Sequence, residues 1–157
     1  SSDVCSSDLS EGRLSSESKL KIRAMLREVT EIESIGDSCY NLARTINHKY
    51  RGNEDFTEKQ YSHIHQMFQL TDDALNQMVS LVEDEGHQVD VNKSFNLENE
   101  INNYRSQLKN QNVLDVNNKE YDYQMGVHYM DLIGECEKLG DYIVNVVEAR
   151  TDMKEKK

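Results

Sequence analysis

One apolar stripe runs through the first third of the chain without interruption. Apolar residues recur at a spacing of about 3.5 positions, which is the spacing of one face of an α-helix. They are Ile22, Met25, Leu26, Val29, Ile32, Ile35, Cys39, Leu42, Ala43 and Ile46. The 157 residues include no proline and only seven glycines, so few residues interrupt long helices. The pattern predicts one amphipathic helix over about residues 16–49.

Three further helices are predicted downstream. The segment from Tyr50 to Phe56 ends the first helix, and Thr57 followed by Lys59 and Gln60 is typical of a helix start. The second helix is expected to end near Gly86, the third to cover about residues 89–110 and the fourth about residues 119–154. The asparagine-rich stretch 110–118 is predicted to be a loop. We therefore expect an all-α fold, an antiparallel bundle of four long helices.

The expected domain does not include the first residues of the chain. The opening nine, SSDVCSSDL, have no helical periodicity and resemble the translation of a sequencing adapter. We expect residues 1–9 to be such an artefact, residues 10–18 to be a linker, and residues 19–154 to form the helical domain. On this interpretation the domain is truncated on its N-terminal side. The first helix then either docks on a bundle of the other three or belongs to an equivalent bundle.

Charge and composition exclude several classes of partner. The formal net charge of −11 leaves no basic patch for a nucleic-acid backbone, so we expect no nucleic-acid partner and regard cations as better guests. No apolar run approaches the roughly 20 residues that span a bilayer. The three cysteines lack metal-ligand spacing, which favours a reducing compartment and hence the cytoplasm.

An internal repeat is the main functional signal. The stretch EIESIGDSCYNL at 31–42 matches ECEKLGDYIVNV at 135–146, with a constant offset of 104 positions. Glu31 aligns with Glu135, Glu33 with Glu137, Gly36 with Gly140, Asp37 with Asp141 and Asn41 with Asn145. Glycine inside a helix costs about 1 kcal/mol relative to alanine, so we expect each motif glycine to permit the close approach of a helix or ligand.

The repeated side chains have the chemistry of a metal site. Glu33, Asp37 and Asn41 are spaced i, i+4, i+8 on one side of a helix, and Glu137, Asp141 and Asn145 repeat that spacing. Two such lines of oxygen atoms could surround a cation, and oxygen ligands without histidine or thiolate favour magnesium, manganese or iron over structural zinc. The alternative is a solvated acidic face, which composition and spacing alone favour about two to one.

The sequence offers little support for an enzyme. The motifs of ferritin-like di-iron bundles and of zinc hydrolases are absent, and no serine or cysteine has a base in register with it. His63 and His65 point to different helix faces and are expected at the surface or its boundary. Cys39 and Cys136 fall on apolar stripes and are expected to be small core residues.

The repeated pattern E-x-x-G-D-x-x-x-N, at 33–41 and again at 137–145, resembles the signature of the PhoU family. Its members are six-helix proteins built from two three-helix repeats, each with an acidic motif on its last helix. The resemblance covers residues 19–150 and implies that the four helices here match the last helix of the first repeat and all three of the second. YQMGVHYMDLIGECEKLGDYIVNVVEAR, at 123–150, is similar to the end of bacterial sodium/phosphate cotransporters that carry a PhoU-like domain.

The resemblance implies a function and a set of ligands. Family members bind iron or zinc clusters at these motifs and are associated with the control of phosphate uptake. Glu33, Asp37, Glu137 and Asp141 are the implied ligands, with Asn41 and Asn145 as additions. The family often has Arg and His beside the motif acids, whereas this chain has Ser34 and Lys138, and Ser38 and Tyr142.

The resemblance implies the function of a regulatory domain of a sodium-dependent phosphate cotransporter, involved in phosphate transport and its control, on the cytoplasmic side of the plasma membrane. It would contact the membrane transporter domain of its own full-length chain and carry no catalytic site, and a homo-oligomer is an expected assembly. The alternatives are a free-standing PhoU-type regulator and a structural helical bundle that binds no metal.

Overall fold

The computed structural model describes residues 14–51, 55–84 and 90–154, which form four helices and no strand. They are α2 (Ser16–Arg51), α3 (Glu58–Glu83), α4 (Val91–Asn117) and α5 (Tyr123–Lys154). The prediction of an all-α bundle of four long helices is therefore confirmed. The expected artefact at residues 1–9 lies outside the described residues, and α2 begins at Ser16, inside the expected linker.

Polar side chains cap the starts of all four helices, and at α2 the Ser15 hydroxyl accepts from the Ser18 amide at 3.1 Å. Thr57 and Gln60 form a capping box at α3, in which the Thr57 hydroxyl accepts from the Gln60 amide at 3.1 Å and the Gln60 side chain accepts from the Thr57 amide at 3.0 Å. Asp90 accepts from the Asn92 amide at the start of α4, and Asp122 accepts from the Met125 amide at the start of α5. The expected helix start at Thr57 is confirmed.

The expected loop at 110–118 is wrong, because α4 continues through this stretch to Asn117. Asparagine is a poor helix former, but tertiary contacts override that weak preference here. Leu108 and Asp115 lie two helical turns apart on the same face, and both are buried. The turn comes later, where Lys119 adopts a left-handed backbone conformation with φ 59°, and this shortens the fourth helix to start at Tyr123.

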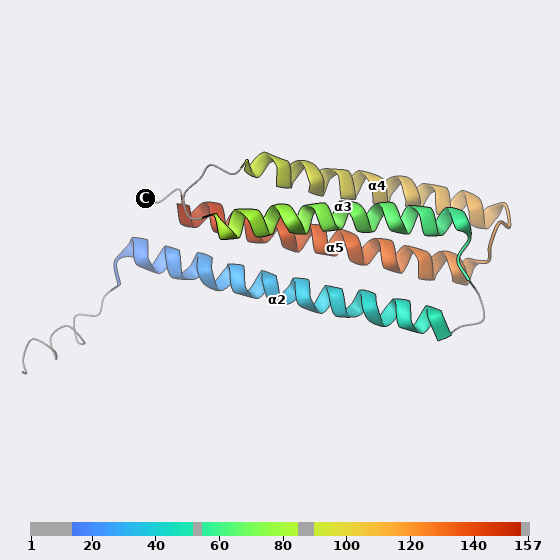
Figure 1. Cartoon of the computed structure of the whole chain (residues 1–157), viewed down its shortest axis with the longest axis horizontal. Helices are drawn as coiled ribbons and strands as arrows, with labels where there is room; N and C mark the ends of the chain where they lie inside the picture. The colour runs from blue at the N-terminus through green and yellow to red at the C-terminus, as the bar shows by residue number, and fades with distance from the viewer. Residues whose placement is uncertain (1–13, 52–54, 85–89, 155–157) are drawn as a thin grey trace, which may run out of the picture.

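Helix α5 lies at the centre of the arrangement (Figure 1). Helices α3, α4 and α5 pack against one another as a three-helix bundle, while α2 packs on α5 and, within the described residues, on no other helix. α2 runs antiparallel to α5, since Arg27 meets Glu148 and Ser38 meets Glu135. The expectation that the last three helices form a bundle, with the first docked on it, describes this arrangement.

The core is centred on α5. Its residues Ile133, Ile143, Val146 and Val147 are at most 1% exposed. Met67 of α3 and Ile101 of α4 are fully buried in the same core. Cys136 is buried as expected, but Cys39 is exposed, because only the α5 side of α2 is covered. None of the described helices combines the length and the apolar character needed to cross a membrane.

Candidate functional site

The two copies of the repeated motif meet where α2 crosses α5. The Asn145 amide donates to the Glu31 carboxylate at 3.2 Å, and the Asn41 amide donates to the Glu135 carboxylate at 3.4 Å. Glu31 and Glu135 occupy the same motif position, and so do Asn41 and Asn145. Each copy thus binds the other through the same two residues, as the antiparallel crossing of two equivalent helices requires. We call these contacts the reciprocal Glu–Asn pairs.

Glu135 has the richer surroundings of the two glutamates. The Ser38 hydroxyl, itself only 2% exposed, donates to Glu135 at 2.7 Å, and the Lys138 ammonium lies 3.5 Å from its other oxygen. Ser38 corresponds to Tyr142 in the second copy, so Glu31 receives no matching hydroxyl. A buried hydroxyl without a hydrogen-bond partner is destabilising. Loss of the Glu135 carboxylate is therefore expected to reduce stability more than loss of the Glu31 carboxylate.

The structure places the six predicted ligands in three environments. Asn41 and Asn145 turn their amide groups to the reciprocal Glu–Asn pairs. Glu33, Asp37 and Asp141 are exposed, and Glu137 forms an ion pair with Arg105 of α4 at 2.5 Å. Among the side chains that the structure describes, at residues 14–47, 55–84 and 90–153, no three from His, Cys, Asp or Glu are grouped so that they could hold a metal ion.

The two motif glycines also differ in their surroundings. A β-carbon at Gly140 would lie 3.4 Å from the Ile101 side chain of α4, which is ordinary packing contact, so a neighbouring helix does approach here. A β-carbon at Gly36 would meet nothing within 4 Å. The expected approach of a helix is therefore present at the second copy, and the described residues place no helix at the first.

Replacing Gly36 with alanine is expected to raise the free energy of unfolding by up to about 1 kcal/mol. Alanine reduces the conformational entropy of the unfolded chain, and its β-carbon would clash with nothing in the folded helix. Thermal unfolding of dilute protein should show an increase in Tm of about 2–4 °C. Gly134→Ala, also in open space, should behave alike. Gly126→Ala should be destabilising, since its β-carbon would lie 2.9 Å from Asn112. A decrease in Tm for Gly36→Ala would contradict the prediction.

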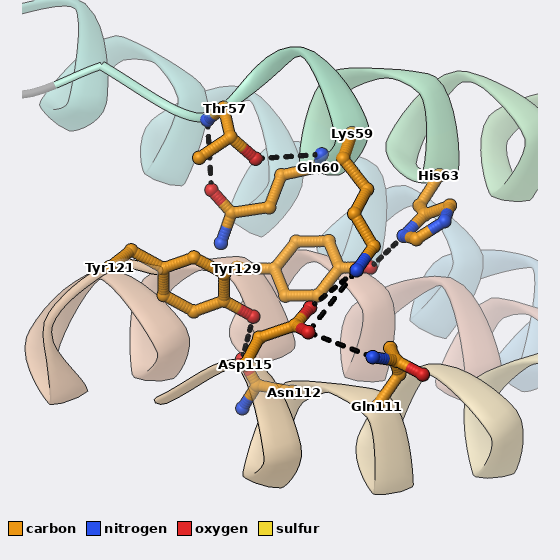
Figure 2. A network of polar contacts seen from close by, with 9 residues as sticks. All are labelled: Thr57, Lys59, Gln60, His63, Gln111, Asn112, Asp115, Tyr121 and Tyr129. Atoms are coloured by element: carbon orange, nitrogen blue, oxygen red, sulfur yellow. Dashed lines mark hydrogen bonds and ion pairs between the residues drawn. The ribbon is translucent and has the colours of Figure 1, made fainter. Parts of the chain in front are cut away.

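A second polar cluster joins the start of α3 to the end of α4 (Figure 2). The Lys59 ammonium lies 3.1 and 3.0 Å from the two carboxylate oxygens of Asp115, which is only 4% exposed. Gln111 donates to the same carboxylate at 2.8 Å. Nearby, His63 Nδ1 and the Tyr129 hydroxyl lie 2.9 Å apart. We call Lys59, Gln111, Asp115, His63 and Tyr129 the Asp115 cluster.

Burial and the contacts within the Asp115 cluster shift the pKa values of its members. Burial raises the pKa of Asp115, but hydrogen bonds from Gln111 and Lys59 and the Lys59 charge outweigh it, and the net pKa is lowered. Burial, followed by the Lys59 charge, lowers the pKa of His63. Burial also raises the pKa of Tyr129. At neutral pH the carboxylate is therefore charged, while the imidazole and the phenol are neutral.

Sequence reasoning missed both sets of contacts. Glu31 and Glu135 are visible in the sequence as repeated positions, but they fall outside the i, i+4, i+8 lines of predicted ligands. Asp115 lies in the stretch that the sequence predicts to be a loop. Its spacing of seven from Leu108 is the signal that would have placed it on the buried face of a helix.

Comparison with known proteins adds one finding. The PhoU domain model matches residues 64–149, more than half of the chain. The match takes in all of α4, most of α3 and α5, and the second copy of the motif. No curated protein and no solved structure gives a significant match.

Proposed function

Because this chain belongs to the PhoU domain family, we propose that it is the regulatory domain of a sodium-dependent phosphate cotransporter. The observation that carries the proposal is the family match over 64–149, which includes the repeated acidic motif of α5. The family is regulatory and non-catalytic, and we expect the chain to control transport without a reaction of its own. Its location would be the cytoplasmic side of the plasma membrane.

The transporter context rests on the segment 123–150, which forms most of α5 and resembles the end of such cotransporters. The partner would be the membrane transporter domain of the same full-length chain. A free-standing PhoU-type regulator would use the same fold. The two differ in the gene, since only the cotransporter has apolar spans of about 20 residues before the domain.

Metal binding belongs to the same proposal. The exposed carboxylates of Glu33, Asp37 and Asp141 would each offer oxygen atoms to a cation, and Glu137 would have to exchange its contact with Arg105. Since no three of the described acidic side chains are grouped around one point, ligands from outside them would have to complete the site. The cation would be a divalent ion or a small cluster of iron, zinc, manganese or magnesium, completed by ligands such as water. Asn41 and Asn145 are assigned to the helix crossing and not to the metal.

Regulation requires that the domain contact different states of its transporter differently, because a ligand shifts an equilibrium only by its differential affinity for the two states. An acidic face that gains positive charge on binding metal would supply such a difference. Charge on the motif is then the variable that the transporter domain senses.

Phosphate uptake tests this function. Cells carrying the complete gene would be compared with cells whose gene lacks the codons for residues 19–154, over a range of external phosphate. We expect the deletion to leave sodium-dependent uptake in place and to abolish its response to phosphate supply. Identical uptake curves for the two strains would refute the proposed function.

A further inference from the structure

The second copy of the motif already holds a positive charge. On α4, the Arg105 guanidinium places its Nε 2.5 Å from a carboxylate oxygen of Glu137 on α5. The two side chains are 34% and 28% exposed, so water and salt screen their charges only in part. Both residues lie in the segment that matches the PhoU domain, and both belong to the bundle of α3, α4 and α5. The acidic face of α5 therefore binds a cation that the chain itself supplies.

Packing of α4 on α5 keeps Arg105 beside Glu137. A β-carbon at Gly140, one helical turn from Glu137, would lie 3.4 Å from the Ile101 side chain, so the two helices approach closely at this point. Ile101 is fully buried, and it lies one turn before Arg105 on the same side of α4. The backbone that carries Arg105 is therefore fixed, and its guanidinium stays within reach of Glu137 even when the contact is broken.

The contact is of a kind that another cation can displace. The strongest contacts between arginine and carboxylate are bidentate, with two parallel hydrogen bonds. Here Nε of Arg105 is the nearest guanidinium atom to Glu137, and it forms no hydrogen bond of good geometry with the residues that the structure describes. Partly exposed ion pairs of this kind contribute little to stability. Arg105 thus occupies the Glu137 carboxylate without binding it tightly.

A metal ion at the second copy would have to compete with this guanidinium. Glu137 and Asp141 are spaced i, i+4 on α5, and Asp141 is exposed. A divalent ion that binds both carboxylates would be repelled by the charge of Arg105 and would have to replace it at Glu137. Since the guanidinium is attached to α4, it competes at a high effective concentration. The metal affinity of the second copy should therefore depend on Arg105.

We propose that Arg105 is a built-in competitor of metal at the second copy of the motif, and that a divalent ion binds Glu137 and Asp141 by displacing it. The inference rests on the metal binding of the proposed function and adds what sets its threshold. Arginine remains charged in proteins, so displacement is the way to remove it from the site. Displacement also breaks a contact between α4 and α5, which gives the domain two states that a partner can distinguish.

Titration with Mn²⁺, with the free ion measured by electron paramagnetic resonance, tests the competition. All variants carry Glu33→Gln/Asp37→Asn, which neutralises the first copy so that the second copy is measured alone. Arg105→Met removes the charge and keeps an aliphatic side chain, and it should tighten Mn²⁺ binding at least about fivefold. Arg105→Lys keeps a positive charge on α4, and its affinity should stay within about twofold of the background.

Arg27→Met is the matched control. Arg27 also pairs with a glutamate of α5, Glu148, at 2.9 Å, so the substitution removes the same charge from an ion pair outside the second copy. It should leave the Mn²⁺ affinity unchanged. Asp141→Asn added to Arg105→Met should abolish the gain in affinity, because the bound ion would lose one of its two carboxylates. Circular dichroism and thermal unfolding without metal verify that each variant is folded.

The outcomes separate this inference from the proposed function. Tighter binding by Arg105→Met and not by Arg27→Met supports the inference. Equal affinities of Arg105→Met and the background would overturn it and leave metal binding in place, and so would an equal gain from Arg27→Met, since net charge alone would then explain the effect. If no variant binds Mn²⁺, Arg105→Met included, both the inference and the metal binding of the proposed function are wrong.

Discussion

Replacing Lys59 with methionine is expected to lower the free energy of unfolding by about 2–4 kcal/mol, which corresponds to a decrease in Tm of about 5–15 °C. The substitution keeps the aliphatic stem and removes the charge. The Asp115 carboxylate, whose side chain is 5% exposed, then keeps the hydrogen bond from Gln111 but loses the compensating charge of Lys59. The partial exposure of Lys59 places the loss below that of a fully buried pair.

Lys109→Met is the matched control for this prediction. Lys109 is exposed and forms no side-chain hydrogen bond or ion pair with the residues that the structure describes, so the change should alter stability by less than about 0.5 kcal/mol. Chemical denaturation of the two variants provides the comparison. Equal effects from the two substitutions would show that the Asp115 cluster contributes nothing specific to stability.

The Lys59–Asp115 ion pair also predicts that the stability of the unmodified chain and that of Lys59→Met respond to acid in opposite directions. In the unmodified chain the pKa of Asp115 is lowered, so its stabilisation is present above the unfolded pKa and is lost as the pH falls toward the folded one. Without Lys59, burial would raise that pKa, and protonation would relieve a destabilising buried charge. His63, whose pKa is lowered, destabilises both proteins in acid. We expect the stability gap between the two proteins to narrow from about pH 7 to about pH 4.

Glu135→Ala is expected to destabilise the chain by about 1–3 kcal/mol, because it leaves the buried Ser38 hydroxyl and the Asn41 amide without their acceptor. Glu135→Gln retains an acceptor oxygen and should cost less. A double-mutant cycle with Asn41→Ala measures the coupling directly, and we expect an interaction energy of at least about 0.5 kcal/mol. Additive effects of the two substitutions would mean that the reciprocal Glu–Asn pairs do not hold α2 to α5.

The sequence was sufficient for the number and type of the helices, because apolar periodicity and the Thr57 cap are local features. It misplaced the end of α4, since the burial of Asp115 depends on its contact with Lys59 of α3, which lies 56 residues earlier in the chain. It also assigned Asn41 and Asn145 to a ligand line, because spacing on one helix does not reveal which side faces another helix. Cys39 was misplaced for the same reason. Periodicity identifies a face, whereas only the packing of helices shows whether that face is covered.

Division of the repeated motif into two roles is the central claim, and metal content per chain tests it most directly. Equilibrium dialysis against iron, zinc, manganese or magnesium, followed by elemental analysis, would compare the unmodified chain with Asp37→Asn/Asp141→Asn and Asn41→Ala/Asn145→Ala. The account predicts that the aspartate variant loses bound metal and retains its helicity, while the asparagine variant binds metal normally and is less stable. Metal lost with the asparagines and kept without the aspartates would contradict it, and a chain that binds no metal would favour a purely structural bundle.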